Sequence, residues 1–505
     1  MRSSLGRLAV LIAVAALIAA ACGSSTTTTA PSGDATAAPA SAGASASADA
    51  AASAGPTPIT ATTTGKPGDV EIVWYCCLGG GDAIEQVEAQ QKVAADFNAS
   101  HPGIHLSFLA VPYAGASDTL AVQLASGNGP DIVGPVGIGG ANAFHGQWMD
   151  LQPFIDKSGY DMSAFPKATV DLYNVGGEGQ TGIPFAVYPS ALFYRAKLFK
   201  EAGLKEPPHD WGGTYTMPDG SVVPWDWDTA QKVARMLTVD KNGKDATQDG
   251  FDPESIVQWG LEPQRDDPRQ TGAYFKAGTL VGADGKTAQI PDAWATAWHK
   301  FYDGIWTDHV SMTGPQFLDT TLNPDNYPFF TGNVAMSPNY LWATWGIANS
   351  GTDWNVAATP SFQGQTTAAL NADTFRMLKS TKHPDEAWTV LTYLLDDARQ
   401  DLLQTYGAMP ARPAETEAFF DTFQHSTGDD GKALYPQAID WNVIKEGVNH
   451  ADVPNFESYM PNYNKALKLL NTFSTKWQAT PGLNLDTEIA DLKSQLQAVF
   501  DQAGG

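Results

Sequence analysis

The chain has 505 residues, with 30 Lys and Arg against 55 Asp and Glu, so its formal net charge is −25. A body this acidic repels phosphate backbones, which excludes nucleic acid as an expected partner. The 15 Trp, 16 Tyr and 22 Phe residues supply many flat rings. Most of these will fill a core, but a ring in a turn-rich context can face a cleft.

Residues 1–21 are typical of a cleavable export signal. Arg2 and Arg7 lie in a short basic start, and the run Leu8–Ala21 is apolar and uncharged. That run is too short to span a bilayer comfortably, and small residues precede the expected cleavage boundary. We therefore expect residues 1–21 to be a signal peptide and the protein to be exported.

Cys22 directly follows this boundary. Its position resembles the lipobox of bacterial lipoproteins, in which the thiol receives a diacylglycerol, although Ala19 stands where that motif usually has Leu. The alternative is secretion with an unmodified Cys22, but an exported free thiol would be a liability. We expect a lipid anchor that holds the protein at the extracytoplasmic face of the cell membrane.

A low-complexity segment follows the anchor. Residues 22–67 are mostly Ser, Thr, Ala, Gly and Pro, with Ile59 as the one large aliphatic side chain. Such a composition buries too little apolar surface to fold, so it predicts a disordered linker. About 440 residues remain, which is more than one core usually organises, so two lobes are expected. No later segment has the apolar length of a transmembrane helix.

The first part of the body has an alternating pattern of strands and helices. Three apolar runs predict strands, and the segments between them predict helices. The strands are expected at Val70–Tyr75, Ile104–Val111 and Asp131–Gly134, and the second helix at about Ser117–Ser126. This β-α-β-α-β order predicts a doubly wound α/β sheet, which binds ligands at the carboxyl ends of its strands.

Local signals place the start of the first helix and the Gly-rich strand ends. Asp82 is expected as its N-cap, with Glu85 three residues on. The carboxyl ends of the first and third expected strands are Cys76–Gly81 and Gly134–Asn142, both rich in Gly. Further helical patterns occur at Ala293–Trp306, Pro384–Leu395 and Leu485–Phe500.

Sequence markers along most of the body resemble those of a known family, the extracellular solute-binding proteins (family 1) of bacterial carbohydrate ABC importers. The markers occur in the family's order, which makes the resemblance specific although each is weak alone. They are Ile72-Val-Trp74, Phe97-Asn-Ala-Ser-His-Pro102, Ala125-Ser-Gly-Asn-Gly-Pro-Asp131, Gly182-Ile-Pro-Phe185 with Tyr188-Pro-Ser-Ala-Leu-Phe-Tyr194, Leu198-Phe-Lys-Glu-Ala-Gly203, Phe330-Thr-Gly-Asn-Val-Ala-Met336, His383-Pro-Asp-Glu-Ala-Trp388 and Gly407-Ala-Met-Pro410.

This resemblance implies a two-lobed periplasmic-binding-protein-like fold of type II, with doubly wound sheets joined by a hinge and a ligand cleft between the lobes. It implies lobe 1 at residues 68–188 and 371–408, and lobe 2 at residues 189–370 and 409–505. The chain should cross between lobes near Tyr188-Pro189, Ala369–Ala372 and Ala408–Pro410.

The resemblance also implies what the protein does. Such a protein captures a sugar or oligosaccharide, delivers it to the permease subunits of an ABC transporter, and performs no chemistry. We expect a monomer without a cofactor. The alternative is an exported polysaccharide-active enzyme, a glycoside hydrolase or lyase, which would need the same aromatic and acidic side chains.

Aromatic candidates follow Ala335-Met336, where the maltose-binding branch of the family carries a Trp that stacks on sugar. They are Tyr340, Trp342 and Trp345, and Trp342 matches that position best. A flat ring covers the apolar C–H face of a pyranose. The alternative role for Trp342 is in the core.

Polar candidates lie near the strand starts and the expected crossings. Asp131 and Asp373 each offer a carboxylate that can accept two hydroxyl hydrogen bonds, and Arg376 is close to Asp373 in sequence. Asp131 could equally cap its turn. Tyr188 lies at the first crossing, where its ring could serve both hinge and cleft.

Cys76 and Cys77 are adjacent cysteines at the end of the first strand. Outside the cytoplasm a thiol pair tends to oxidise, and no other cysteine is left if Cys22 is lipidated. We expect a disulfide that forms a rigid apolar knob facing the cleft, so both residues are also ligand-binding candidates. The alternative is two reduced thiols.

Two motif-like segments are rejected. Gly282-Ala-Asp-Gly-Lys-Thr287 lacks the first Gly of a P-loop, because that position is Leu280. Asp240, Asn242 and Asp245 suggest a calcium loop but have the Gly two positions too early for an EF-hand. A surface turn is favoured there over a structural Ca²⁺.

Overall fold

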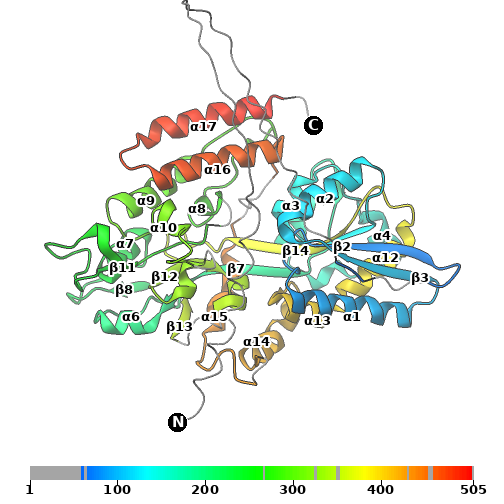
Figure 1. The fold of residues 1–505 in the computed structure, drawn as a ribbon, viewed down its shortest axis with the longest axis horizontal. Helices are drawn as coiled ribbons and strands as arrows, with labels where there is room; N and C mark the ends of the chain where they lie inside the picture. The colour runs from blue at the N-terminus through cyan, green and yellow to red at the C-terminus, as the bar shows by residue number, and fades with distance from the viewer. Residues whose placement is uncertain are drawn as a thin grey trace, which may run out of the picture. The chain divides into compact units, whose positions relative to one another are not determined.

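The computed structural model describes residues 59–61, 65–265, 268–323, 327–347, 353–428, 431–452 and 459–502 (Figure 1). The expected signal peptide, Cys22 and most of the linker lie outside the described residues. Within the described ranges, no helix combines the length and apolar character needed to cross a membrane.

The helices and strands alternate along the chain. The strands are β1 (Ile59–Ala61), β2 (Val70–Cys76), β3 (Ile104–Ala110), β4 (Ile132–Gly137), β5 (Asn174–Val175), β6 (Gly179–Gln180), β7 (Ala186–Arg195), β8 (Thr214–Thr216), β9 (Val222–Pro224), β10 (Val239–Asp240), β11 (Ile256–Gln258), β12 (Met336–Tyr340), β13 (Trp354–Ala357), β14 (Leu370–Met377) and β15 (Met409–Pro410). The α-helices are α1 (Ile84–Ser100), α2 (Tyr113–Ala125), α3 (Ile138–Ala143), α4 (Gln152–Ser158), α5 (Lys167–Asp171), α6 (Ala196–Glu201), α7 (Trp227–Leu237), α8 (Gln270–Ala273), α9 (Asp292–Trp306), α10 (Gly314–Phe317), α11 (Thr344–Ile347), α12 (Pro384–Leu395), α13 (Arg399–Tyr406), α14 (Thr416–Gln424), α15 (Trp441–Gly447), α16 (Tyr463–Ala479) and α17 (Leu485–Phe500).

Among the described residues, nine strands form one sheet in the order β1-β3-β2-β4-β14-β7-β12, and β13 and β15 also pair with β7. β2 runs parallel to both β3 and β4, whereas β14 is antiparallel to β4 and β7. The predicted β-α-β-α-β unit is therefore present, with its three parallel strands side by side. The expectation of an α/β fold is confirmed.

The start of α1 differs from the expected one. Its N-cap is Ala83, and the side chain of Gln86 accepts the Ala83 N–H at 3.4 Å. The carboxylate of Asp82 instead accepts the N–H of Tyr113 at 2.8 Å. This bond ties the start of α2 to the start of α1, and α2 begins at Tyr113 rather than near Ser117.

The expectation that the linker is disordered is wrong for one short stretch of it. Ile59–Ala61 forms β1 and pairs antiparallel with Ala110–Phe108 at the edge of the sheet. The outer edge of β3 offers unpaired backbone groups, and a short segment with β-branched residues can satisfy them.

Strand β7 connects two groups of elements, and all ten of its residues are buried. Its first half pairs with β14 and β15, and its second half pairs with β12 and β13. In the register Pro189 is opposite Leu370 and Val187 is opposite Met409. The three segments expected to cross between lobes thus lie side by side, and Figure 1 shows β7 and β14 running between the blue and cyan elements and the green ones.

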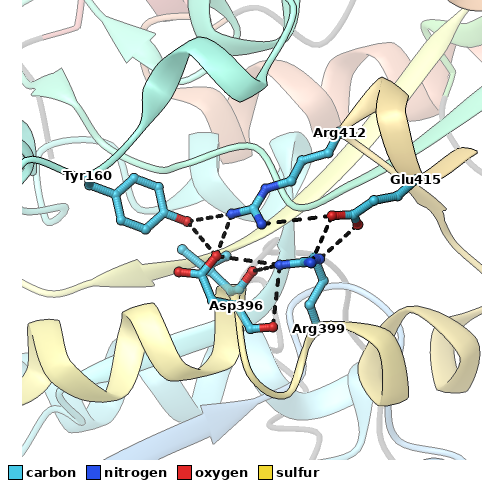
Figure 2. A network of polar contacts seen from close by, with 6 residues as sticks. Tyr160, Asp396, Arg399, Arg412 and Glu415 are labelled. Atoms are coloured by element: carbon cyan, nitrogen blue, oxygen red, sulfur yellow. Dashed lines mark hydrogen bonds and ion pairs between the residues drawn. The ribbon is translucent and has the colours of Figure 1, made fainter.

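A polar network holds the chain where it leaves β15 (Figure 2). Arg399 donates two hydrogen bonds to Glu415, at 2.9 and 2.8 Å. Arg412 donates to Asp396 and, at 3.0 Å, to the Tyr160 hydroxyl. Because Asp396 follows α12 and Arg399 begins α13, the network fixes the third crossing segment to the junction of these two helices.

Candidate ligand site at the carboxyl ends of β2 and β4

The site is built where two parallel strands end. After β2, Leu78 bridges to Val136, and the Gly137 N–H donates to the Leu78 carbonyl at 3.4 Å. Gly137, the last residue of β4, is paired with Asp373 of β14. The end of β2, the end of β4 and the Asp373 carboxylate therefore meet at one edge of the sheet.

Asp373 lies between two glycine backbones. A Cβ at Gly79 would stand 3.0 Å from its Oδ2, and a Cβ at Gly137 would stand 3.1 Å from its Oδ1. A larger residue at either position would push the carboxylate away.

The Tyr188 hydroxyl donates a side-chain hydrogen bond to Asp373. Burial raises the pKa of Asp373 to about 7, and the bond from Tyr188 partly opposes that rise. Burial also raises the pKa of Tyr188 well above its ordinary value, and the Asp373 charge adds to this. Tyr188 therefore stays neutral and donates, while Asp373 changes protonation near neutral pH.

The strand register extends this group to a residue that the sequence did not indicate. Asn371 is opposite Tyr188, and it lies two positions from Asp373 on β14, so the three share one face of the sheet. The Asn371 Oδ1 is buried and has no hydrogen-bond partner among the described residues. It is an acceptor available to a ligand hydroxyl. The signal that could have indicated it is the two-residue spacing from Asp373.

The aromatic candidates lie on the far side of β7. Tyr340 is opposite Ser190 on β7 and is fully buried. Its ring stacks on Trp342, with centroids 5.8 Å apart and planes 12° apart, and the edge of Tyr327 also meets Trp342. Trp342 is only half-buried. Tyr340 therefore supports Trp342 from behind, and Trp342 has the accessible ring. Trp345 belongs to α11, but its side chain lies outside the described part of the structure.

Cys76 and Cys77 are joined by a disulfide, and both are fully buried. A Cβ at Gly81 would stand 3.0 Å from the Cys76 Sγ and 3.3 Å from the Cys77 Sγ. Gly81 has a φ of 116°, which favours glycine, so the loop after β2 folds directly over the sulfurs. The structure thus places the cysteines beneath the loop, where they support it, and not as the expected knob on the cleft surface.

Two glutamines attach this loop to its surroundings. Gln90 donates to the Gly81 carbonyl at 2.7 Å and accepts from the Tyr406 hydroxyl at 2.9 Å. Gln86 accepts the Gly81 N–H at 3.1 Å and donates to the Thr405 carbonyl at 3.1 Å. Because Thr405 and Tyr406 end α13, just before β15, the loop is tied to the third crossing segment.

Asp131 does not join the group around Asp373. It precedes β4, so it lies at the opposite end of that strand from Gly137. Its carboxylate accepts the Val73 N–H at 2.9 Å and the Thr381 hydroxyl at 2.5 Å. Both oxygens are thus used within the fold, as in the capping alternative.

Arg376 does not join the group either. Its side chain is buried, donates to Thr181, and lies over the rings of Trp148 and Tyr173, with its Cζ 5.5 and 5.2 Å from their centroids. Burial lowers the pKa of Arg376 to about 10. It is an interior cation held by aromatic faces.

The acidic loop around Asp240 contains a hydrogen-bonded turn. The Asp240 carboxylate accepts the N–H groups of Asn242, Lys244 and Asp252 at 2.8, 3.0 and 3.0 Å, and Asp245 accepts from Thr247. Within the described ranges, no group of three or more His, Cys, Asp or Glu side chains is placed to hold a metal ion.

Residues 81–401 match the family described as bacterial extracellular solute-binding protein. The chain belongs to this family. Curated relatives of this solute-binding protein include binding proteins of Brucella abortus and Brucella suis, each 23% identical over 347 residues that cover 65% of this chain and 73% of the relative. The family assignment makes the chain a transport component and not an enzyme, so the polysaccharide-active alternative falls.

Solved structures have the same fold as this solute-binding protein. An ABC substrate-binding protein of Listeria monocytogenes in complex with cycloalternan has a TM-score of 0.64 at 16% identity, covering 85% of this chain and 98% of its own. The GacH receptor of Streptomyces glaucescens, solved unliganded and with acarbose, has a TM-score of 0.61 at 16% identity, covering 86% and 99%. A maltotriose-binding protein of Thermus thermophilus, bound with maltotriose, has a TM-score of 0.57 at 16% identity, covering 85% and 99%. The expected periplasmic-binding-protein-like fold is confirmed.

Proposed function

We propose that this solute-binding protein captures a sugar or oligosaccharide and delivers it to the permease subunits of an ABC importer. The observation that carries the proposal is the polar group at the carboxyl ends of β2 and β4. Asp373 and Asn371 offer acceptors on one face of the sheet, and the neutral Tyr188, opposite Asn371 on the neighbouring strand, donates to Asp373. Convergent hydrogen-bond acceptors beside a hydroxyl donor suit a neutral polyol.

The aromatic side of the site fits the same ligand class. Trp342 is half-buried and supported by Tyr340, which is the arrangement of a rigid platform for the apolar face of a pyranose. Carbohydrates are also the ligands named for the similar proteins of Listeria monocytogenes, Streptomyces glaucescens and Thermus thermophilus.

Closure of two lobes is part of the proposal. The lobes are residues 68–188 with 371–408 and residues 189–370 with 409–505, and the hinge consists of the segments around Tyr188, Asn371 and Met409. These segments pair with one another through β7, next to the polar group. A ligand that bonds to them would act directly on the hinge.

The cellular setting is proposed from the N-terminus alone. An export signal followed by lipidated Cys22 and a polar linker would hold the body, as a monomer, at the extracytoplasmic membrane face near its permease.

The test is a binding screen on the body without its signal and linker. Purified protein is incubated with glucose, maltodextrins, cello-oligosaccharides and xylo-oligosaccharides, and melting temperature and sugar integrity are both measured. A raised melting temperature with unchanged sugar supports the proposal, and Asp373→Asn should abolish that rise. Cleaved sugar, or no rise with any carbohydrate, would contradict it.

A further inference from the structure

Exposed apolar side chains also lie near the carboxyl ends of the parallel strands, outside the group around Asp373. Tyr113 begins α2 and is 63% exposed, and Ile84 begins α1 and is 72% exposed. Of the Phe, Tyr and Trp side chains whose burial the structure describes, Tyr113 alone falls in the exposed class. In a chain this rich in aromatic residues, the exposed ring stands at the same sheet edge as the proposed site.

The position of Tyr113 is fixed by a contact, not left to a mobile loop. The Asp82 carboxylate accepts the Tyr113 N–H at 2.8 Å. Asp82 follows Gly81, which lies on the buried disulfide. The loop that places Gly79 against Asp373 therefore also holds Tyr113, through Asp82, which is three residues further along the chain from Gly79.

The distance between the strands that carry Asp373 and lead to Tyr113 matches a chain of sugar rings. In the sheet order, β4 and β2 separate β14 from β3, so the strands carrying Asp373 and leading to Tyr113 are about 14 Å apart at ~4.8 Å per strand. Between them lies the glycine loop, and a Cβ at Gly80 would meet nothing within 4 Å. A ligand could thus lie against bare backbone there. One pyranose is too short to reach both residues.

We propose that Tyr113, with Ile84 nearby, forms an outer sugar-binding subsite, so that the ligand is an oligosaccharide reaching from Asp373 to Tyr113. The Tyr113 ring would cover the C–H face of an outer sugar, and its hydroxyl would stay at the wet rim. This inference rests on the proposed function, because it assigns the substrate class to the same site.

The test measures how affinity depends on ligand length, with and without the Tyr113 side chain. Dissociation constants are measured by calorimetry for maltose to maltopentaose and for cellobiose to cellopentaose, with wild type, Tyr113→Ala, Tyr113→Phe and Val122→Ala. Val122 is the control, because it is 69% exposed on the same helix. In the series that binds, affinity for wild type should rise with length. Tyr113→Ala should lose about tenfold for the longest members and less than about twofold for the disaccharide. Tyr113→Phe should keep most of the gain, and Val122→Ala should match wild type.

The outcomes separate the two proposals. Affinity that depends on Asp373 but is unchanged by Tyr113→Ala at every length supports the proposed function and overturns the outer subsite. An equal loss at all lengths also overturns it, because it indicates a general disturbance of α2. No binding in either series, together with no shift in the wider screen, overturns the proposed function and the subsite with it.

Discussion

The Asp373 carboxylate accepts a hydrogen bond from the Tyr188 hydroxyl across two antiparallel strands, β14 and β7. Both residues belong to the segments proposed as the hinge. Under the proposed function, recognition and hinge movement would therefore involve the same side chains.

The first prediction concerns pH. The folded pKa of Asp373, about 7, lies above the ordinary value of 3.8, because burial disfavours the charged carboxylate. Between these values the folded protein holds a proton that the unfolded chain has released, so stability falls as pH rises from about 4 to about 7. Asp373→Asn should remove this fall. Between pH 5 and pH 8 the free energy of unfolding of wild type should therefore decrease by about 1–3 kcal/mol more than that of the variant.

The measurement is chemical unfolding of ligand-free protein at both pH values. Asp284→Asn is the control, because hydrogen bonds from Thr287 lower the pKa of Asp284 to about 2 and keep it charged throughout. Equal pH dependence in wild type and Asp373→Asn would show that Asp373 does not titrate in this range.

The second prediction concerns Trp342. Trp342→Ala should weaken sugar binding by about 1–3 kcal/mol, because it removes a stacking platform, and should lower the melting temperature only slightly, because the ring is half-buried. Trp306→Ala is the matched control: its ring is also half-buried, but its indole N–H bonds to the Trp477 carbonyl on α16. It should cost stability and leave affinity unchanged. The reverse pattern would place Trp342 in the core.

The third prediction concerns the oxidation of Cys76 and Cys77. The intact mass of the body without Cys22 should be lower by two hydrogens than after reduction. Because both cysteines are buried, thiol labelling must be done in denaturant, and it should detect no thiol before reductant is added. Two labelled thiols in untreated protein would contradict the disulfide.

The fourth prediction concerns what the disulfide supports. Reduction, or the double change Cys76→Ser and Cys77→Ser, should lower affinity more than stability, because the sulfurs lie under the loop that places Gly79 against Asp373. Calorimetry and melting curves on the same samples compare the two effects. A large loss of stability with full affinity in the remaining folded protein would contradict this prediction, because it would show that the disulfide stabilises the whole fold and not the binding loop.

The fifth prediction concerns closure. Small-angle scattering on the body should show a smaller radius of gyration with the sugar found in the screen than without it, because the lobes close on the ligand. Asp373→Asn at the same sugar concentration serves as the non-binding control. An unchanged radius for a saturated wild type would exclude closure while leaving binding intact.

Much of the local structure followed from sequence patterns. α12 and α17 have the predicted bounds, and β2, β3 and α9 differ from theirs by one residue. These elements have strong apolar periodicity and clear end signals, such as Pro384 at the first position of α12. Tyr188 and Asp373 were indicated by the family resemblance and their place near the crossings.

The composition of the site depended on the pairing of distant strands. Asn371 joins the site because β14 pairs with β7, about 180 residues earlier in the chain, in one particular register. Asp131 is not part of the candidate site, because its carboxylate oxygens accept hydrogen bonds from the Val73 N–H and the Thr381 hydroxyl. Asp82 is not the N-cap of α1, because α2 brings the N–H of its first residue, Tyr113, to the Asp82 carboxylate. Local periodicity determines which segments become strands and helices, but hydrogen-bond partners far apart in the chain decide which polar atoms remain free for a ligand.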